Sequence, residues 1–377
     1  MQFIIDTIQQ SPEQAITFAE FMNLALYHPE HGYYSSGKVE IGSQGDFFTA
    51  SSLGSDFAEL LAEQFREMWE VMGYPITFTL VEIGAGSGYF AADILSYLQE
   101  KYHDFYSKIN YIIVEKSPES IKKQRNLLTE FSNIIWQDWL DINYNSITGC
   151  IFSNELIDAL PVHKIIIKEQ QLKEIYVTVS EGKLQEVVKD ISTPRLLDYF
   201  QLININLPSD DYPENYYSEV NLNALDWLTT VTNKLNRGYI LTIDYGYTAQ
   251  KYYHSQRYQG TLKCYYQHRH HDNLYVNIGE QDITAHVDFT ALENQGKLLG
   301  LETVGLTQQG LFLMGLGLGD RLSELSNGQY SLTEIFQRRD ALHQLIDPMG
   351  LGKFYVLIQS KRLTEQQKLK SLKGLKT

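Results

Sequence analysis

The stretch LVEIGAGSGYFAADIL, residues 80–95, contains an apolar run, three glycines at every second position and then a helical pattern. The apolar run begins at Phe78 and lacks a regular polar alternation, which is typical of a strand buried on both faces. Open α/β sheets bind ligands beyond the carboxyl ends of their strands. Glycines let the backbone approach a ligand closely, and the N-terminus of the next helix favours a negative group. This order predicts a parallel α/β sheet with a ligand-binding turn at residues 84–88.

The alternation of strand and helix continues along the chain. Further apolar strands are predicted at residues 109–117, 133–140, 148–153, 238–246 and 352–361. Helical patterns are predicted at residues 16–26, 53–73, 89–102, 118–128, 221–236 and 289–300. This order predicts a doubly wound α/β fold, with a mostly parallel sheet, helices on both of its faces and two insertions.

The two insertions differ in pattern. Residues 162–220 begin with two or three short antiparallel strands, with turns at KEQQ and SEGK, and the part from residue 190 onward has an irregular, acidic pattern. Residues 247–290 are polar and rich in tyrosine and histidine. A loop of that length is usually functional or has structure of its own.

Three segments are expected along the chain. Residues 1–75 form an N-terminal helical segment that packs on the core, and residues 76–360 form the main domain, which carries both insertions. The last segment, residues 361–377, is basic, and we expect a solvated, flexible end there.

Charge and composition narrow the class of protein. The net charge is −15 although the final segment is basic, so the body is acidic. An acidic body disfavours nucleic acid as a partner, because such binding depends on neutralising phosphates, and it suits a basic partner. Two cysteines, Cys150 and Cys264, form no disulfide framework, and the chain shows neither a signal or transit pattern nor an apolar run long enough for a membrane span. We therefore expect a cytoplasmic protein.

The glycine turn has a specific pattern, E-x-G-x-G-x-G, formed by Glu82, Gly84, Gly86 and Gly88. The dinucleotide-binding pattern requires a glycine where this chain has Tyr89. The observed pattern is similar to the first motif of Rossmann-like S-adenosylmethionine-dependent methyltransferases. That resemblance implies that the turn faces the methionine end of the cofactor. The alternative is a tight turn that packs a helix closely and binds nothing.

Further candidates for cofactor binding lie after the next two strands. Glu115 ends the second strand, where a carboxylate can accept hydrogen bonds from both ribose hydroxyls; alternatively it begins a surface turn. Asp138 and Trp139 come after the third strand, where an acid can accept from the adenine amine beside an aromatic ring, although Asp138 also suits a helix cap. Thr49, in the loop GDFFTAS, is a candidate for closing over the cofactor from the other side.

Candidates for catalysis lie after the fourth strand, in SNELIDALP. Such enzymes place there the groups that meet the methyl acceptor, and Asn154, Glu155 and Asp158 are polar groups just outside the strand. A carboxylate such as Glu155 can hold the positive charge of a guanidinium on the nitrogens that do not attack, with Asp158 in support. The alternative is that this stretch only caps a helical turn.

The second insertion contains Glu280, Asp282, His286 and Asp288 within GEQDITAHVDF. Their spacing allows a metal site, but methyl transfer from a sulfonium needs no metal, and we expect none. We expect this segment to cover the cofactor and build the acceptor pocket. His286 is a candidate proton acceptor, because the pKa of histidine lies near neutral.

Several motifs together resemble the MidA-like methyltransferase family: GDFFTAS, VEIGAGSGYFAADIL, SNELIDALPVHK, GYILTIDYG and GEQDITAHVDFTAL. The resemblance extends from about residue 16 to residue 358. Its mitochondrial members are complex I assembly factors that act as protein arginine methyltransferases. The resemblance therefore implies a methyltransferase domain at 76–360, S-adenosyl-L-methionine as cofactor and S-adenosyl-L-homocysteine as product. It also implies symmetric ω-N dimethylation of an arginine in a protein substrate, an NADH/quinone-oxidoreductase-type subunit.

Other functions remain open at this point. The chain could be a non-catalytic, cofactor-binding assembly chaperone or a small-molecule methyltransferase. A nucleotide-dependent oxidoreductase is disfavoured by Tyr89 in the glycine motif. Twenty-six tyrosines give surfaces that would suit a homodimer, and the sequence leaves the oligomeric state open.

Overall fold

The computed structural model describes residues 1–35, 50, 53–267, 269–325, 327 and 331–376. Contacts divide the chain into two compact units. The first unit comprises residues 1–40, 157–229 and 246–295, and the second comprises residues 41–156, 230–245 and 296–377. These units do not coincide with the segments expected from the sequence, because the first forty residues group with the two insertions.

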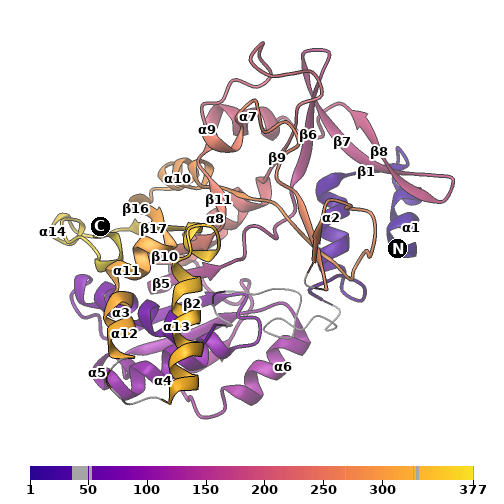
Figure 1. Cartoon of the computed structure of the whole chain (residues 1–377). Coiled ribbons are helices and arrows are strands. Elements are labelled where there is room, and N and C mark those ends of the chain that lie inside the picture. The colour runs from indigo at the N-terminus through magenta and orange to yellow at the C-terminus, as the bar shows by residue number, and fades with distance from the viewer. Residues whose placement is uncertain (36–49, 51–52, 268, 326, 328–330, 377) are drawn as a thin grey trace. The chain divides into compact units, whose positions relative to one another are not determined.

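Seven strands of the described chain form the sheet of the second unit, in the order β16-β17-β10-β5-β2-β3-β4 (Figure 1). Their bounds are β2 (Phe78–Ile83), β3 (Ile109–Val114), β4 (Ile134–Trp136), β5 (Ile147–Asn154), β10 (Leu235–Asp244), β16 (Glu302–Gln308) and β17 (Tyr355–Lys361). The five strands β10, β5, β2, β3 and β4 run parallel to one another, whereas β17 is antiparallel to both β10 and β16. The expected mostly parallel α/β sheet is therefore confirmed, and its parallel strands end at one edge.

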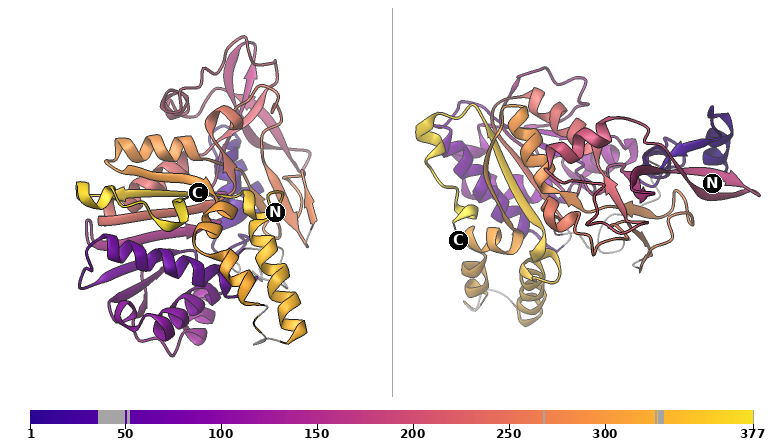
Figure 2. Two further views of the ribbon diagram at one scale, coloured as in Figure 1. Left: turned by 60° about the vertical axis from the view of Figure 1, so that its left-hand side comes forward. Right: turned by 90° about the horizontal axis from the view of Figure 1, so that it is seen from above.

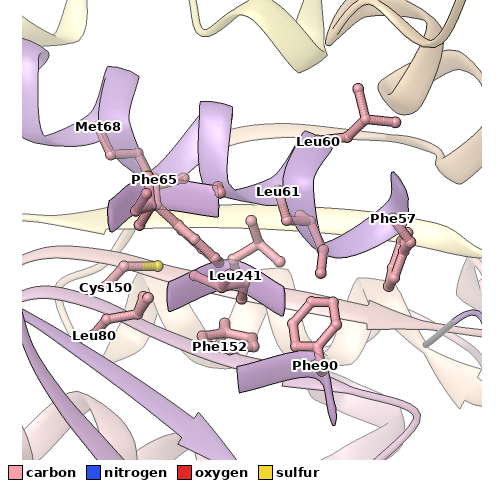
Figure 3. Packing of buried hydrophobic residues seen from close by; sticks show 14 of the residues in the cluster. Phe57, Leu60, Leu61, Phe65, Met68, Leu80, Phe90, Cys150, Phe152 and Leu241 are labelled. Atoms are coloured by element: carbon pink, nitrogen blue, oxygen red, sulfur yellow. The ribbon is translucent and has the colours of Figure 1, made fainter. Parts of the chain in front are cut away.

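Helix α3 covers one face of this sheet with the apolar side that its sequence predicts. Its side chains pack on Leu80, Phe152 and Leu241 from three different strands, and Phe90 of α4 joins them (Figure 3). The helices of the second unit are α3 (Asp56–Val71), α4 (Tyr89–Lys101), α5 (His103–Tyr106), α6 (Pro118–Leu127), α11 (Gln309–Gly315), α12 (Leu318–Glu324), α13 (Leu332–Ile346) and α14 (Glu365–Lys368).

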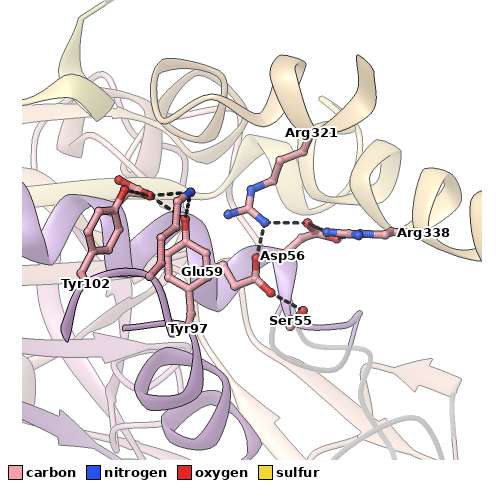
Figure 4. A network of polar contacts seen from close by, with 9 residues as sticks. Ser55, Asp56, Glu59, Tyr97, Tyr102, Arg321 and Arg338 are labelled. Carbon is pink, nitrogen blue, oxygen red and sulfur yellow. Dashed lines mark hydrogen bonds and ion pairs between the residues drawn. The ribbon is translucent and has the colours of Figure 1, made fainter. Parts of the chain in front are cut away.

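An ion-pair network joins α3 to two helices that the sequence analysis did not predict, α12 and α13 (Figure 4). Asp56 at the start of α3 accepts hydrogen bonds from Arg338 at 2.7 Å and from Arg321 at 3.0 Å, and Arg321 also bonds to Glu59. Burial alone would raise the pKa of Asp56, but the hydrogen bonds and charges of both arginines outweigh burial and lower it. Helix α13 also packs on α11 (Figure 2).

The first unit contains a second sheet, in which β7 pairs with β1, β6 and β8, and β6 also pairs with β9. Its bounds are β1 (Ala15–Thr17), β6 (His163–Lys168), β7 (Gln171–Ser180), β8 (Lys183–Lys189) and β9 (Tyr217–Val220). The predicted antiparallel strands of the first insertion are present, with their turns at the predicted places. However, the irregular pattern after residue 190 hides α7 (Arg195–Leu202) and β9, which pack into an aromatic core with Phe200 and Tyr253.

The remaining helices and strands lie near the N-terminus, between the two insertions, and within or at the ends of the second insertion. Their bounds are α1 (Gln2–Gln10), α2 (Phe18–Tyr27), α8 (Leu222–Lys234), β11 (Gly246–Tyr247), α9 (Ala249–Tyr252), β12 (Lys263–Tyr266), β13 (Arg269–His271), β14 (Asp282–Thr284), β15 (Val287–Asp288) and α10 (Phe289–Leu298). The second insertion thus has structure of its own. Ile16 lies in β1 rather than in the predicted helix, which begins after Thr17 with a capping box.

The basic segment after residue 361 differs from the solvated end expected there. Leu372 is fully buried, and the backbone of Lys373 and Gly374 donates hydrogen bonds to Glu67 and Gln64 of α3. Its charge pattern concealed these apolar and backbone contacts. Over the residues that the structure describes, no helix is long and apolar enough to cross a membrane.

Candidate functional site

The glycine turn joins β2 to α4 at the edge where the parallel strands end. Gly84, Gly86 and Gly88 have φ angles of 71°, 52° and 86°, in the left-handed region that favours glycine. The N–H of Gly84 donates to Val114 O at 3.0 Å, and Gly88 occupies the N-cap position of α4. A Cβ on Gly84 would lie 3.3 Å from the side chain of Leu156. A residue larger than glycine at position 84 would therefore crowd Leu156. The arrangement leaves exposed backbone and a helix N-terminus available to a ligand.

Glu82 lies in β2, two residues before Gly84. The residue is 5% exposed, and its carboxylate accepts a hydrogen bond from the hydroxyl of Tyr111 at 2.7 Å. Burial raises its pKa to about 7, against the lowering effect of the Tyr111 hydrogen bond, and the charge of Glu115 adds to the rise.

Glu115 comes directly after β3 and is partly buried. Its Oε1 accepts the N–H groups of Lys116 and Ser117 at 2.8 and 2.9 Å, in the irregular segment between β3 and α6. Its Oε2 accepts from Gln124 Nε2 at 3.4 Å, which directs the carboxylate toward the glycine turn. Gln124 was not singled out from the sequence, because one glutamine in a polar helix gives no signal.

Asp138 and Trp139 lie just beyond β4, where the third strand was expected to end. Asp138 is exposed, and its Oδ1 accepts the N–H of Leu140 at 2.9 Å. The helix-cap interpretation of Asp138 is wrong, because residues 138–141 form a turn rather than a helix. Trp139 is half-buried. Thr49, the remaining candidate for cofactor binding, lies outside the described residues.

Asn154 and Glu155 stand together at the end of β5. Asn154 Nδ2 donates to Glu155 Oε1 at 3.3 Å, and the same oxygen accepts the N–H of Ala50 at 3.4 Å. The backbone N–H of Glu155 donates to Ile243 O at 2.9 Å, which ties it to the neighbouring strand β10. Glu155 has φ 49°, an uncommon conformation for a residue with a side chain. The helix-cap alternative for this stretch is wrong, because residues 155–160 form bends and a turn.

Asp244 is a residue that the sequence analysis missed. It ends β10 beside Asn154, since Ile243 and Asn154 are register partners, and it is fully buried. Its Oδ1 accepts the N–H of Tyr245 at 2.9 Å. The sequence contained a usable signal, because the acid stands at the end of the predicted strand GYILTIDYG, as Glu115 does after the second strand.

Asp158 and His286 belong to the first unit, and the structure places their backbones close together. The N–H of Ala285 donates to Asp158 O at 2.9 Å, and the N–H of His286 donates to Thr261 Oγ1 at 3.1 Å. The imidazole of His286 stacks on Tyr247 with ring centroids 5.0 Å apart. The backbone contact between residues 158 and 285 thus joins the segment just before the first insertion to the second insertion.

The remaining acids of the second insertion have separate partners. Asp282 accepts from the hydroxyl of Tyr34 at 2.7 Å, and Asp288 accepts from that of Tyr199 at 3.0 Å. Glu280 is exposed. Within the described ranges, no group of three or more histidine, cysteine or acidic side chains is arranged to hold a metal ion.

Comparisons with known proteins agree with the cofactor expected from the glycine motif. The model of a family described as an S-adenosyl-L-methionine-dependent methyltransferase matches residues 60–307. A solved structure from Burkholderia thailandensis, bound to S-adenosyl-homocysteine, is similar with a TM-score of 0.85 and 28% identity over 100% of this chain and 94% of that chain.

Curated relatives are similar along most of their length. A Rattus norvegicus protein named protein arginine methyltransferase NDUFAF7, mitochondrial, is 29% identical over 92% of this chain and 82% of its own. A Drosophila melanogaster homologue with the same activity in its name is 27% identical over 89% of this chain and 79% of its own.

Proposed function

The chain belongs to the S-adenosyl-L-methionine-dependent methyltransferase family, and on that premise we propose that it dimethylates an arginine of a protein partner symmetrically on the ω-nitrogens. The enzyme class and the cofactor follow from family membership and from the relative bound to S-adenosyl-homocysteine. The choice of arginine is supported by the names of curated relatives and by the placement of Glu155.

The residues present fit the cofactor. The turn presents backbone without side chains, because a Cβ at Gly84 or Gly88 would crowd Leu156 or Gln124. Asn154 Oδ1 is buried without a hydrogen-bond partner in the described part of the chain. When bound, the sulfonium supplies an electrophilic methyl group and leaves as a neutral thioether. We assign the methionine end to the turn formed by Gly84, Gly86 and Gly88, with Glu82 supporting the turn from below.

The adenosine end of the cofactor is assigned to the two neighbouring strand ends. Glu115 would accept from the ribose hydroxyls, because among the described residues its Oε2 accepts one long hydrogen bond, at 3.4 Å from Gln124. Asp138 would accept from the adenine amine, with the half-buried Trp139 against the ring. Thr49 is assigned to the cover on the opposite side, as its motif implies.

Glu155 carries the assignment of arginine as acceptor. Its backbone is held in an uncommon conformation by a hydrogen bond to β10, and such strain persists where the surrounding structure enforces it, often at functional sites. Its carboxylate would pair with the guanidinium and hold positive charge away from the attacking nitrogen. Asn154 positions this carboxylate, and Asp158 supports acceptor binding. His286 would receive the proton that the nitrogen loses as its new N–C bond forms.

The protein partner is proposed to be an NADH/quinone-oxidoreductase-type subunit. This proposal rests on the family resemblance and on the acidic chain, whose net charge of −15 suits a basic segment around the arginine. We also propose that the protein works in the cytoplasm, since Cys150 and Cys264 are buried free thiols, as a reducing compartment allows.

The test uses cofactor with a labelled methyl group and purified quinone-oxidoreductase subunits as acceptor. We expect label on protein, as symmetric dimethylarginine by mass spectrometry, and a loss of at least about 100-fold in kcat for Glu155→Gln. The matched control is Glu100→Gln, an exposed acid near the C-terminal end of α4, which should leave kcat unchanged.

Three outcomes would contradict parts of the proposal. Label on a soluble metabolite would indicate a small-molecule methyltransferase. Partner binding without any label would indicate an assembly chaperone. Full activity of Glu155→Gln would remove the assigned role of Glu155 while leaving the reaction itself in place.

A further inference from the structure

Gln124 is a fully buried polar side chain within an otherwise exposed or half-buried helix, α6. Glutamine is mostly exposed in proteins, and a buried amide is costly unless it is hydrogen-bonded. Gln124 is the one fully buried side chain among the residues of α6, while Leu127 packs on the core as a partly buried side chain.

The amide contacts groups at the carboxyl ends of three neighbouring strands. Its Nε2 donates to Gly86 O in the turn after β2 at 2.9 Å and to Glu115 Oε2 after β3 at 3.4 Å. Its Oε1 accepts from the indole Nε1 of Trp136, the last residue of β4, at 2.9 Å. One side chain therefore joins the glycine turn, the carboxylate after β3 and the end of β4.

The chemistry of these partners determines the orientation of the amide. An indole N–H can only donate, so the oxygen of Gln124 must face Trp136. The two N–H groups must then face the carbonyl of Gly86 and the carboxylate of Glu115, both of which only accept. The guanidinium of Arg125 lies 5.3 Å from the centre of the Trp136 ring and helps to hold that ring in place.

Gly88 leaves space for this side chain. A Cβ on Gly88 would lie 3.1 Å from Gln124 Cγ, closer than most real contacts. The third glycine of the motif therefore leaves room for the Gln124 side chain and also adopts the positive φ of the turn. Glu115 is held at both oxygens, because Lys116 and Ser117 bond to Oε1 while Gln124 bonds to Oε2.

We propose that Gln124 is a positioning residue for the cofactor, which sets the carboxylate of Glu115 and the carbonyl of Gly86 in the orientation that binding requires. The inference rests on the ribose role given to Glu115 under the proposed function, and it is independent of the methyl acceptor. Preorganised groups raise affinity because their ordering is complete before the ligand arrives.

The experiment measures the affinity of S-adenosyl-homocysteine by calorimetric titration at pH 8. For Gln124→Met, which keeps length but loses all three hydrogen bonds, we expect a Kd about tenfold weaker, the size of a lost hydrogen bond to a charged group. Gln124→Glu keeps the acceptor for Trp136 but replaces the donor with a charge beside Glu115. It should bind more weakly than Gln124→Met, and Trp136→Phe should bind less than threefold more weakly than the unchanged protein.

A purely structural role gives the opposite order. If Gln124 only holds Trp136, Gln124→Glu restores affinity and Trp136→Phe weakens it as much as Gln124→Met does. Thermal unfolding of each variant without ligand shows whether it is folded. A Kd for folded Gln124→Met within twofold of the unchanged protein would overturn the proposal.

A double-mutant cycle tests the route through Glu115. If Gln124 acts through this carboxylate, the pair Glu115→Ala and Gln124→Met should bind within about twofold of Glu115→Ala alone, because the effects of coupled residues do not add. Losses that multiply would overturn that route. An unchanged Kd for Glu115→Ala alone would remove the ribose role proposed for Glu115, and with it this inference. The methylation assay would still test the proposed reaction separately.

Discussion

The hydroxyl of Tyr111 donates a 2.7 Å hydrogen bond to the carboxylate of Glu82, across the neighbouring strands β2 and β3. Both side chains are buried, and Glu82 stands two residues before the first glycine of the turn. Burial, the largest influence, raises the pKa of Glu82 to about 7, so the group that supports the turn changes its charge near neutral pH.

Replacing Glu82 with glutamine should remove a pH dependence of stability. Because the folded pKa lies above the unfolded one, Glu82 stabilises the fold below pH 4.5, and this contribution is lost as pH rises through about 7. The rise corresponds to roughly 3 kcal/mol between the two limits. Glu82→Gln can still accept from Tyr111 and should therefore gain stability relative to the unchanged protein as pH rises from 4.5 to 8.

The measurement is the free energy of unfolding by urea for both proteins at several pH values. Burial also raises the pKa of Asp288 to about 7, so the unchanged protein alone cannot isolate Glu82, and the difference between the two proteins is the informative quantity. A difference that stays constant over this range would show that Glu82 titrates normally.

Glu155→Gly should stabilise the chain relative to Glu155→Ala. Both variants lose the carboxylate, but only alanine keeps a Cβ in the left-handed conformation at φ 49°. The difference should be about 1 kcal/mol in favour of glycine. Denaturant unfolding of the two variants measures it directly, and equal stabilities would mean that position 155 relaxes to an ordinary conformation.

Two substitutions of Gly86 test whether cofactor binding depends on the backbone conformation at this position. Its φ of 52° is accessible to asparagine but strongly disfavoured for a β-branched residue. We expect Gly86→Val to lose S-adenosyl-homocysteine binding and Gly86→Asn to keep measurable affinity, both by calorimetry. NAD should bind to neither variant nor to the unchanged protein. Equal affinities for the valine and asparagine variants would argue that the backbone conformation at this position does not matter.

The parallel strands and the glycine turn were predictable because they depend on local pattern. Each buried strand is a short apolar run, and the left-handed positions after β2 carry glycine. Helix α3 was also predicted, because its apolar residues recur at helical spacing.

The network that orients the site was not predictable from such patterns. Gln124 takes its role from Gly86, Glu115 and Trp136, which reach it only when three strands align in register. Helix α13 was missed for a related reason. It is mostly exposed, so its apolar spacing is weak, and the ion pair between Arg338 and Asp56 that holds it joins distant parts of the chain.

Two leucines of the final basic segment test whether this segment is packed or solvated. Leu372 is fully buried, and the adjoining backbone of Lys373 donates to Glu67 at 2.7 Å. Leu372→Ala should therefore cost about 2–4 kcal/mol of unfolding free energy, as for other core leucines. Leu369→Ala is the matched control, because Leu369 is 85% exposed and should change stability by less than about 0.5 kcal/mol. Urea unfolding measures the loss of stability in each variant, and limited proteolysis measures how accessible the segment becomes. If the two variants behave equally, the segment is the solvated tail that its composition predicts.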